Sequence, residues 1–222
     1  MIAFDPIFNA ARERIGAEAL QRRLPEIRDA AGLAALPDDR YLSQLSLRVF
    51  RAGLKHSLVD AKWPAFEEVF RGFVPGAVLG LSDEDVEALM SDRRLIRHWG
   101  KLRSVRNNAA TLDTISREHG GFGRYLAAWP TDRTLELWAE LGKRFEQMGG
   151  DSAPRFLRMV GRDTFIFSPS VLAALIHWGV SESEPKGKAE RARIQVQFND
   201  WAAATGRPLA HLSMILAASV DA

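Results

Sequence analysis

Basic side chains gather in two stretches of this 222-residue sequence, and each stretch flanks a tight turn. The first runs from 93 to 106 and contains six basic residues and no acidic one. The second surrounds Gly149-Gly150 and consists of Lys143, Arg144, Arg155, Arg158 and Arg162. Lysine and arginine neutralise phosphates, and turn amides donate to phosphate oxygens, so the pattern is compatible with a phosphate backbone as ligand. The alternative is that these residues form solvated helix faces.

Several other chemistries are excluded or disfavoured by the residues present. The sequence has no cysteine, which rules out disulfides, thiolate nucleophiles and Cys-ligated zinc. Its five histidines are dispersed without a metal-binding spacing, so we expect no metal site. The segment Gly120-Gly121-x-Gly123 lacks the Lys-Ser/Thr that completes a phosphate loop, and no serine lies in a nucleophile elbow.

The composition is that of an ordinary globular protein, with 46% hydrophobic and 26% charged residues and a net charge of only +2. The length allows one substantial core or two modest lobes. The sequence shows neither a signal peptide nor an apolar stretch approaching the ~20 residues of a membrane helix. We therefore expect a protein of the cytoplasm that does not enter a membrane.

Apolar residues recur at helical spacing along most of the chain, which predicts an all-α fold. Asp5 before Pro6 and Ser82 before three acidic residues are expected to cap helices, and Gly206 and Gly149-Gly150 to end them. The one possible strand is 164–167. The predicted helices span about 5–20, 38–55, 82–90, 102–118, 132–148, 154–160, 169–178, 189–205 and 209–220.

A series of short motifs between 47 and 109 keeps a common spacing. They are Ala52-Gly53-Leu54, Trp63, Phe66, Phe70, Phe73, Asp85-Val86-Glu87, Leu89, Asp92, Ile96-Arg97-His98, Gly100-Lys101-Leu102 and Asn108-Ala109. This stretch resembles the bacterial 3-methyladenine DNA glycosylase I family, within the helix-hairpin-helix DNA glycosylase superfamily. The resemblance implies a two-lobed all-α fold over residues 1–222, with DNA lying across a cleft between the lobes.

The chain also departs from that family at functional positions. The family's zinc site uses cysteines, so it is not inherited here. Arg48 stands where the family has a glutamate that helps to recognise the alkylated base. His56 stands where the family has a tryptophan that stacks on it. Both changes fall in the base pocket that the resemblance implies.

The C-terminal half resembles the wider superfamily instead. Residues 147–153, Gln-Met-Gly-Gly-Asp-Ser-Ala, are similar to its DNA-gripping hairpin, and 162–167, Arg-Asp-Thr-Phe-Ile-Phe, to its Val-Asp-Thr-His-Ile-Phe segment. The resemblance implies that Asp163 is catalytic. An ionised carboxylate would stabilise the oxocarbenium character that builds on the sugar when an N-glycosidic bond breaks. Alternatively, Asp163 only caps a helix or forms a turn.

The resemblance further implies residues that contact DNA. The hairpin contributes Gly149, Gly150, Ser152 and Arg155. Arg48 either fills the space that a flipped base leaves or pairs with an acid on a surface helix. Arg97 and Lys101 either touch phosphate or hold helix ends.

Aromatic residues are expected to hold the flipped base or to fill the hole it leaves. The expected set is Phe50, His56, Trp63 and Trp99. Each has another interpretation: Trp63 lies at the spacing of a buried helical stripe, His56 could be on the surface, and Trp99 could be a structural anchor.

The favoured function is hydrolytic release of a damaged base, an alkylated purine resembling 3-methyladenine, from double-stranded DNA. Superfamily members that also cleave the strand use a hairpin lysine, and none lies between Met148 and Asp163. We thus expect a monofunctional enzyme without a cofactor, with a monovalent cation at the hairpin carbonyls as an option. The alternatives are a non-catalytic protein that binds damaged DNA and a protein-interaction domain. The lesion and the oligomeric state are left open.

Overall fold

The computed structural model describes residues 2–221, which form helices joined by short loops and contain no strand. The all-α prediction is therefore confirmed. The segment 164–167, a possible strand from its sequence, is irregular backbone. No helix within residues 2–221 is long and apolar enough to cross a membrane. The described chain divides into two compact units, and one of the four boundaries between them falls inside a helix, α10 (Thr134–Arg144).

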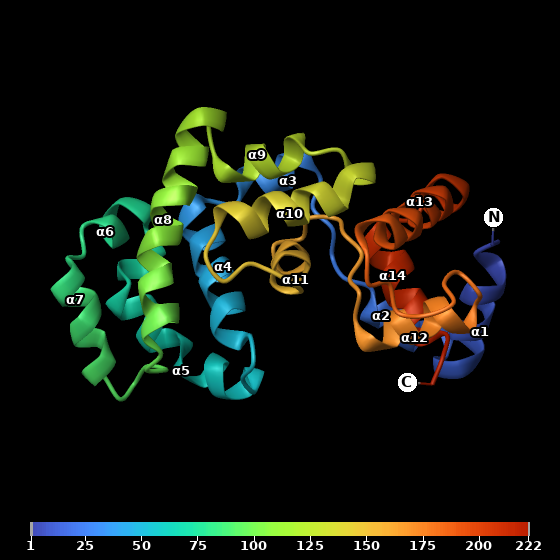
Figure 1. Cartoon of the computed structure of the whole chain (residues 1–222), viewed down its shortest axis with the longest axis horizontal. Coiled ribbons are helices and arrows are strands. Elements are labelled where there is room, and N and C mark those ends of the chain that lie inside the picture. The colour runs from blue at the N-terminus through green and yellow to red at the C-terminus, as the bar shows by residue number, and fades with distance from the viewer. Residues whose placement is uncertain (1, 222) are drawn as a thin grey trace. The chain divides into compact units, whose positions relative to one another are not determined.

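Unit 1 comprises 1–28, 130–137 and 161–222. Its helices are α1 (Asp5–Ile15), α2 (Ala17–Arg23), the short η3 (Thr131–Arg133), α12 (Pro169–His177), α13 (Lys188–Thr205) and α14 (Leu209–Ala218). The apolar helix α14 packs against α1, α12 and α13, so the first and the last helix of the chain are in contact in this unit (Figure 1). Phe165 stacks on Phe198 at 4.5 Å between ring centroids and extends this core into the 161–168 segment.

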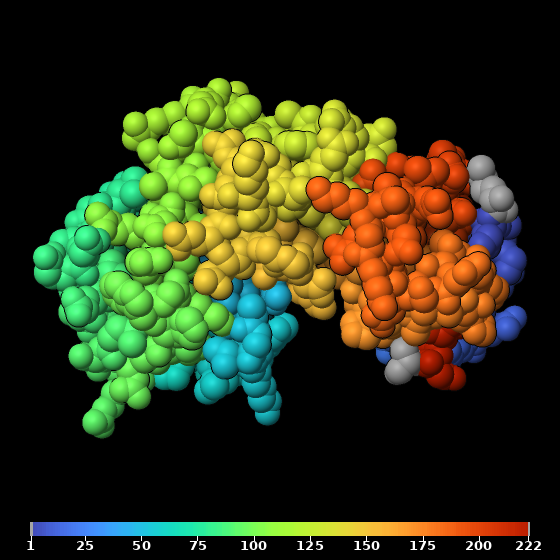
Figure 2. All heavy atoms as spheres, viewed as in Figure 1, coloured from blue at the N-terminus to red at the C-terminus, as the bar shows by residue number. Residues whose placement is uncertain are grey.

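Unit 2 comprises 29–129 and 138–160. Its elements are α3 (Ala30–Ala35), α4 (Asp38–Arg51), α5 (His56–Val69), η1 (Arg71–Phe73), α6 (Pro75–Leu79), α7 (Asp83–Ala88), η2 (Leu89–Ser91), α8 (Trp99–His119), α9 (Phe122–Ala128) and α11 (Ser152–Met159). Helix α4 contacts α5, α8 and α11, so it is buried around most of its circumference. In Figure 2 the gold atoms of the α10–α11 region border the light-blue atoms of α4.

One helix crossing in unit 2 depends on a glycine. Helix α9 approaches α3 so closely that a Cβ on Gly123 would lie 2.0 Å from the carbonyl oxygen of Leu33. The same oxygen accepts a hydrogen bond of 2.8 Å from the Tyr41 hydroxyl. Since no side chain fits there, Gly123 sets the distance between the two helices.

The local helix signals are confirmed at some ends and wrong at others. Ser82 and Asp85 form a capping box at the start of α7, and Gly206 ends α13 in the left-handed conformation. Asp5, expected as a cap, is instead the first helical residue of α1, which starts after Phe4. The helix expected over 132–148 ends at Arg144, before the two glycines.

Candidate functional site

A helical hairpin is formed by α10, a turn over 145–151, and α11. Gln147 and Gly150 both adopt positive φ angles, +63° and +58°, which reverse the chain. Gly149 and Gly150 are exposed, and a Cβ added to either would meet no atom within 4 Å. The turn thus presents backbone to open space, where a ligand backbone can approach closely. Ser152, expected to contact DNA here, is instead largely buried at the start of α11.

The hairpin turn is held by an asparagine whose role the sequence did not reveal. Asn108, buried on α8, accepts from the N–H of Glu146 at 2.8 Å and donates to the carbonyl of Glu146 at 3.1 Å. These bonds satisfy the backbone of Glu146 outside α10, which explains why α10 ends at Arg144. The side-chain amide of its neighbour Asn107 donates instead to the Glu146 carboxylate at 2.8 Å.

Arg48 lies on α4, and only 8% of its surface is exposed. Burial lowers the pKa of Arg48 below its ordinary value, the positive charge of Arg155 lowers it further, and Asp151 opposes the change. Its Nε has no hydrogen-bond partner. Neither predicted role matches this placement, because a buried side chain does not reach into a DNA stack in this conformation and no acid of residues 2–221 pairs with it.

Lys101, on α8, is also nearly buried. Its ammonium donates to the carbonyl oxygens of Ala52 at 2.6 Å and Phe50 at 3.3 Å, at the C-terminal end of α4. Burial, and then the charge of Arg48, lower the pKa of Lys101. Of the two roles predicted for Lys101, this geometry favours holding a helix end, where a cation interacts well with unpaired carbonyls.

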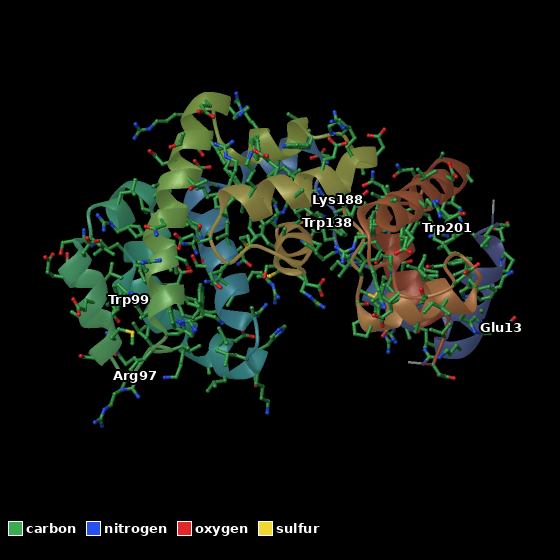
Figure 3. All side chains as sticks on the ribbon, viewed as in Figure 1. Glu13, Arg97, Trp99, Trp138, Lys188 and Trp201 are labelled. Carbon is green, nitrogen blue, oxygen red and sulfur yellow. The ribbon has the colours of Figure 1, made fainter. Side chains whose placement is uncertain are left out.

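The basic stretches are only partly available to a ligand. Arg94 pairs with Asp92 and Glu68, and Arg106 with Asp83. Arg162 of the second stretch is buried rather than displayed on the surface. The exposed residues of the first stretch without an ion pair to residues 2–221 are Arg93, Arg97 and Arg103. Arg97 lies just before α8 and Trp99 begins that helix (Figure 3).

The four aromatic residues expected in a base pocket are not alike in their placement. Phe50 is completely buried, so its assignment to a pocket wall is corrected: it belongs to the core. Trp63 stacks on Phe66 and Phe73 and donates to Ser43 Oγ at 3.2 Å, in line with the helical-stripe alternative. His56 and Trp99 are exposed at the first positions of α5 and α8.

Asp163, in unit 1, sits at the amino end of α14. Its Oδ1 accepts from the N–H of Ala210 at 2.8 Å, and its Oδ2 from the N–H of Leu209 at 3.0 Å. The carboxylate therefore accepts hydrogen bonds from otherwise unpaired amides at the positive end of the helix dipole. The capping alternative is realised, on a helix 46 residues further along the chain. Asp163 is only half-buried, so capping does not close it off from a ligand.

Structural comparison first defines a class, since the fold is that of DNA glycosylases. The chain matches the Staphylococcus aureus 3-methyladenine DNA glycosylase I with a TM-score of 0.52, at 21% identity, over 69% of this chain and 92% of that one. It also matches an 8-oxoguanine glycosylase/lyase of Methanocaldococcus jannaschii, solved with 15mer DNA containing 8-oxoguanine, with a TM-score of 0.52 at 13% identity, over 95% and 93% of the chains.

The family follows from the sequence comparison. The methyladenine glycosylase family model matches residues 31–147, just over half of the chain, and the chain belongs to that family. A DNA-3-methyladenine glycosylase 1 from Escherichia coli (strain K12) is 31% identical over 78 residues. That alignment covers 35% of this chain and 42% of the relative. This match confirms the family resemblance predicted from the motifs between 47 and 109.

Proposed function

We propose that this chain is a DNA glycosylase that releases an alkylated purine resembling 3-methyladenine from double-stranded DNA. Family membership supports this class of activity. The observation that carries the proposal is the carboxylate of Asp163, held on both oxygens by amides of α14. A charged group fixed before the reaction stabilises a developing charge without having to reorganise.

The reaction requires the damaged base to leave the duplex first. As the N-glycosidic bond breaks, positive charge develops on the sugar, and the ionised Asp163 stabilises it. Each carboxylate oxygen has accepted one amide hydrogen and keeps another lone pair, which can orient the attacking water.

Water is the nucleophile in this proposal, since the chain offers no amine at the hairpin. No lysine lies between Met148 and Asp163, so a Schiff base with the sugar is not expected. The product is an abasic site in an uncut strand. The reaction uses no cofactor, and a monovalent cation at the carbonyls of the hairpin would only support DNA binding.

The hairpin is the proposed DNA grip. The open turn at Gly149 and Gly150 would receive one strand, with Arg155 and the exposed Arg97 adding positive charge. The substrate is duplex DNA with a damaged base, in the cytoplasm. The proposal makes no assignment of oligomeric state.

A non-catalytic protein that binds damaged DNA is the second candidate, favoured by one observation. Of the rings expected to hold a base, Phe50 lies in the core, Trp63 is half-buried, and His56 and Trp99 lie on the surface. A protein of this kind would bind a duplex with an abasic analogue tightly and would release no base.

The test is base release from methylated duplex DNA. Liberated bases are separated by chromatography, and abasic sites are counted before and after alkaline cleavage. The proposal expects release of an alkylated purine by the wild type, strand cleavage only after alkali, and strong loss of release in Asp163→Asn. Equal release by wild type and Asp163→Asn would remove Asp163 from the mechanism. Tight binding without release would favour the second candidate.

A further inference from the structure

The beginning of helix α13, in unit 1, displays basic side chains to solvent. Every residue from 186 to 193 is exposed, whereas Ile194, Phe198 and Trp201 further along the helix are buried. Four of these eight exposed residues are basic and one is acidic. The basic ones are Lys186, Lys188, Arg191 and Arg193, and the acid is Glu190. Figure 3 labels Lys188, the first residue of α13. We call residues 186–193 the basic start of α13.

Within residues 2–221, no ion pair involves any of the four cations of the basic start. The carboxylate of Glu190 instead accepts hydrogen bonds from the N–H groups of Gly187 at 3.2 Å and Lys186 at 2.7 Å. These two bonds lower the pKa of Glu190. Two further acids, Glu182 and Glu184, precede the basic start. The basic start itself therefore has a net positive charge, with its one acid bonded to backbone amides.

Cations are unfavourable at this end of a helix. The amino end carries partial positive charge and favours acidic residues, as in α7, whose first turn has three of them. The first turn of α13 begins with Lys188 and has one acid, Glu190. The arrangement lowers the stability of the free protein slightly, and an anion that binds from outside would remove this disadvantage. The basic start is therefore suited to an anionic partner.

The basic start is held close to the segment that carries Asp163, and both belong to unit 1. Phe165 stacks on Phe198 of α13, and the guanidinium carbon of Arg191 lies 5.7 Å from the ring centroid of Phe167. Four residues of chain, from 163 to 167, span at most roughly 14 Å. With the side chains added, Arg191 lies within about 25 Å of the Asp163 carboxylate, a length of about seven base pairs at about 3.4 Å each.

We infer that the basic start of α13 binds the backbone of the DNA duplex beside the damaged nucleotide, within about seven base pairs of it on one side. The inference rests on the proposed function, because it places the damaged sugar at Asp163. Exposed lysines and arginines suit backbone phosphates, which contribute affinity but carry no sequence information. The contact belongs to unit 1 and lies outside residues 31–147, which the family model matches. It is therefore separate from the hairpin.

The first experiment measures how binding depends on salt. The DNA is a duplex with an abasic analogue and ten base pairs on each side. The double variant Lys188→Gln/Arg193→Gln should bind roughly ten- to a hundredfold more weakly at about 0.1 M salt, and its dependence of log K on log salt should flatten by about 1.8, the value for two phosphate contacts. Arg14→Gln/Arg22→Gln is the matched control. It removes the same charge from unit 1, at exposed arginines that already pair with carboxylates. Equal salt slopes for the two double variants would overturn the inference.

A stability measurement separates binding from a structural role. Lys188→Gln/Arg193→Gln should match or slightly exceed the melting temperature of the wild type without DNA, because it removes cations from the positive end of a helix. Arg191 is left unchanged, since its guanidinium lies over Phe167. A marked loss of stability in the double variant would show that these cations serve the fold itself, and would overturn the inference.

The second experiment locates the contact on the DNA. One arm of the duplex is shortened stepwise from ten base pairs to three while the other arm stays long, and the series is repeated for the opposite arm. Wild type should lose affinity when one of the two arms becomes too short to reach the basic start. Lys188→Gln/Arg193→Gln should be insensitive to that shortening. The same loss in wild type and variant for both arms would overturn the inference.

The outcomes remain distinct from those of the proposed function. If wild type releases a base and the variant Lys188→Gln/Arg193→Gln keeps the wild-type salt dependence, the glycosylase proposal stands and this inference fails. If the variant flattens the salt dependence and loses the response to arm length, but wild type never releases a base, the DNA contact stands and the glycosylase proposal fails.

Discussion

Lys101 in unit 2 and Asp163 in unit 1 use the same physical device with opposite sign. Lys101 places its ammonium on carbonyls at the C-terminal end of α4, and Asp163 places its carboxylate on amides at the N-terminal end of α14. Each charge interacts favourably with the helix dipole. They differ in access, because Lys101 is nearly buried whereas Asp163 is half-buried and keeps part of its surface exposed. A charge at a helix end thus serves structure when it is enclosed and can serve chemistry when it is open.

The family match follows a similar division. Residues 31–147 lie mostly in unit 2, and they include Arg48, Lys101 and Asn108. Asp163 and its partners on α14 lie outside the matched range. The unit that identifies the family therefore contains the buried Arg48 and Lys101, whereas the carboxylate proposed for catalysis belongs to the other unit. Variants that act on one unit alone test this division.

The largest effect is expected from Asp163→Asn. An amide keeps one acceptor for the start of α14 but loses the negative charge, so base release should fall about a hundred- to a thousandfold, as when an electrostatic stabiliser of a transition state is removed. Binding to a duplex with an abasic analogue should change little. The measurement is single-turnover release of bases from methylated DNA.

The matched control for this variant is Asp29→Asn in unit 2. Asp29 also caps a helix, α3, where it accepts from the N–H of Gly32 at 2.7 Å. Because asparagine caps helices as well as aspartate does, this control should keep both fold and activity. An equal loss of release in the two variants would mean that helix capping, and not chemistry, explains the role of Asp163.

Gly123→Ala should give the largest loss of stability among these variants. The new Cβ would press on the Leu33 carbonyl, and α3 or α9 would have to move, at a cost of about 3 kcal/mol. Urea unfolding measures the loss. Amide exchange should accelerate in α3, α4 and α9 of unit 2 and less in α14 of unit 1.

Gly76→Ala on α6 provides the comparison, since a Cβ at that glycine meets no atom within 4 Å. Its stability should stay within about 1 kcal/mol of the wild type, because alanine fits a helix at least as well as glycine. Similar unfolding midpoints for the two variants would contradict the close helix crossing.

Asn108→Ala tests the support of the hairpin. It leaves the N–H and the carbonyl of Glu146 without their buried partner, which should lower the free energy of unfolding by about 2 kcal/mol. Affinity for duplex DNA should also fall, because the turn at Gly149 and Gly150 loses its anchor. Asn107→Ala is the control, since Asn107 bonds an exposed carboxylate. Two variants with the same DNA affinity would show that the turn needs no such anchor.

These residues also show where sequence reasoning succeeds. The capping box at Ser82 and the helix stop at Gly206 depend on neighbours within four residues, so local chemistry predicts them. The end of α10 depends on Asn108, which bonds Glu146 from 38 residues earlier in the chain, and the helix was accordingly expected to run too far. Only tertiary packing brings such partners together.

The candidate site follows the same rule. The motif around Asp163 drew attention to a carboxylate whose catalytic role stays a prediction, and its amide partners, 46 and 47 residues further along, could not be predicted locally. Arg48 was expected either to fill the space that a flipped base leaves or to pair with an acid on a surface helix. Its burial results from α5, α8 and α11 packing around α4, which no periodicity within α4 alone reveals.

The smallest effect is a pH dependence carried by Lys101. Its folded-state pKa is lowered by burial and by Arg48, so the unfolded chain holds the proton more tightly. The unfolded state then binds more protons between the folded pKa and the ordinary lysine value, and the free energy of unfolding rises with pH across that window. Wild type should therefore gain stability relative to Lys101→Met as the pH approaches the pKa of an unperturbed lysine.

Urea unfolding at several pH values measures this difference in stability. Lys143→Met is the control, because Lys143 is an exposed lysine on α10. The gain should shrink in an Arg48→Gln background, because one source of the lowered pKa is gone. Parallel pH curves for wild type and Lys101→Met would show that burial of the ammonium does not make stability depend on pH. Lys101 and Asp163 would then differ only in how accessible their charged groups are.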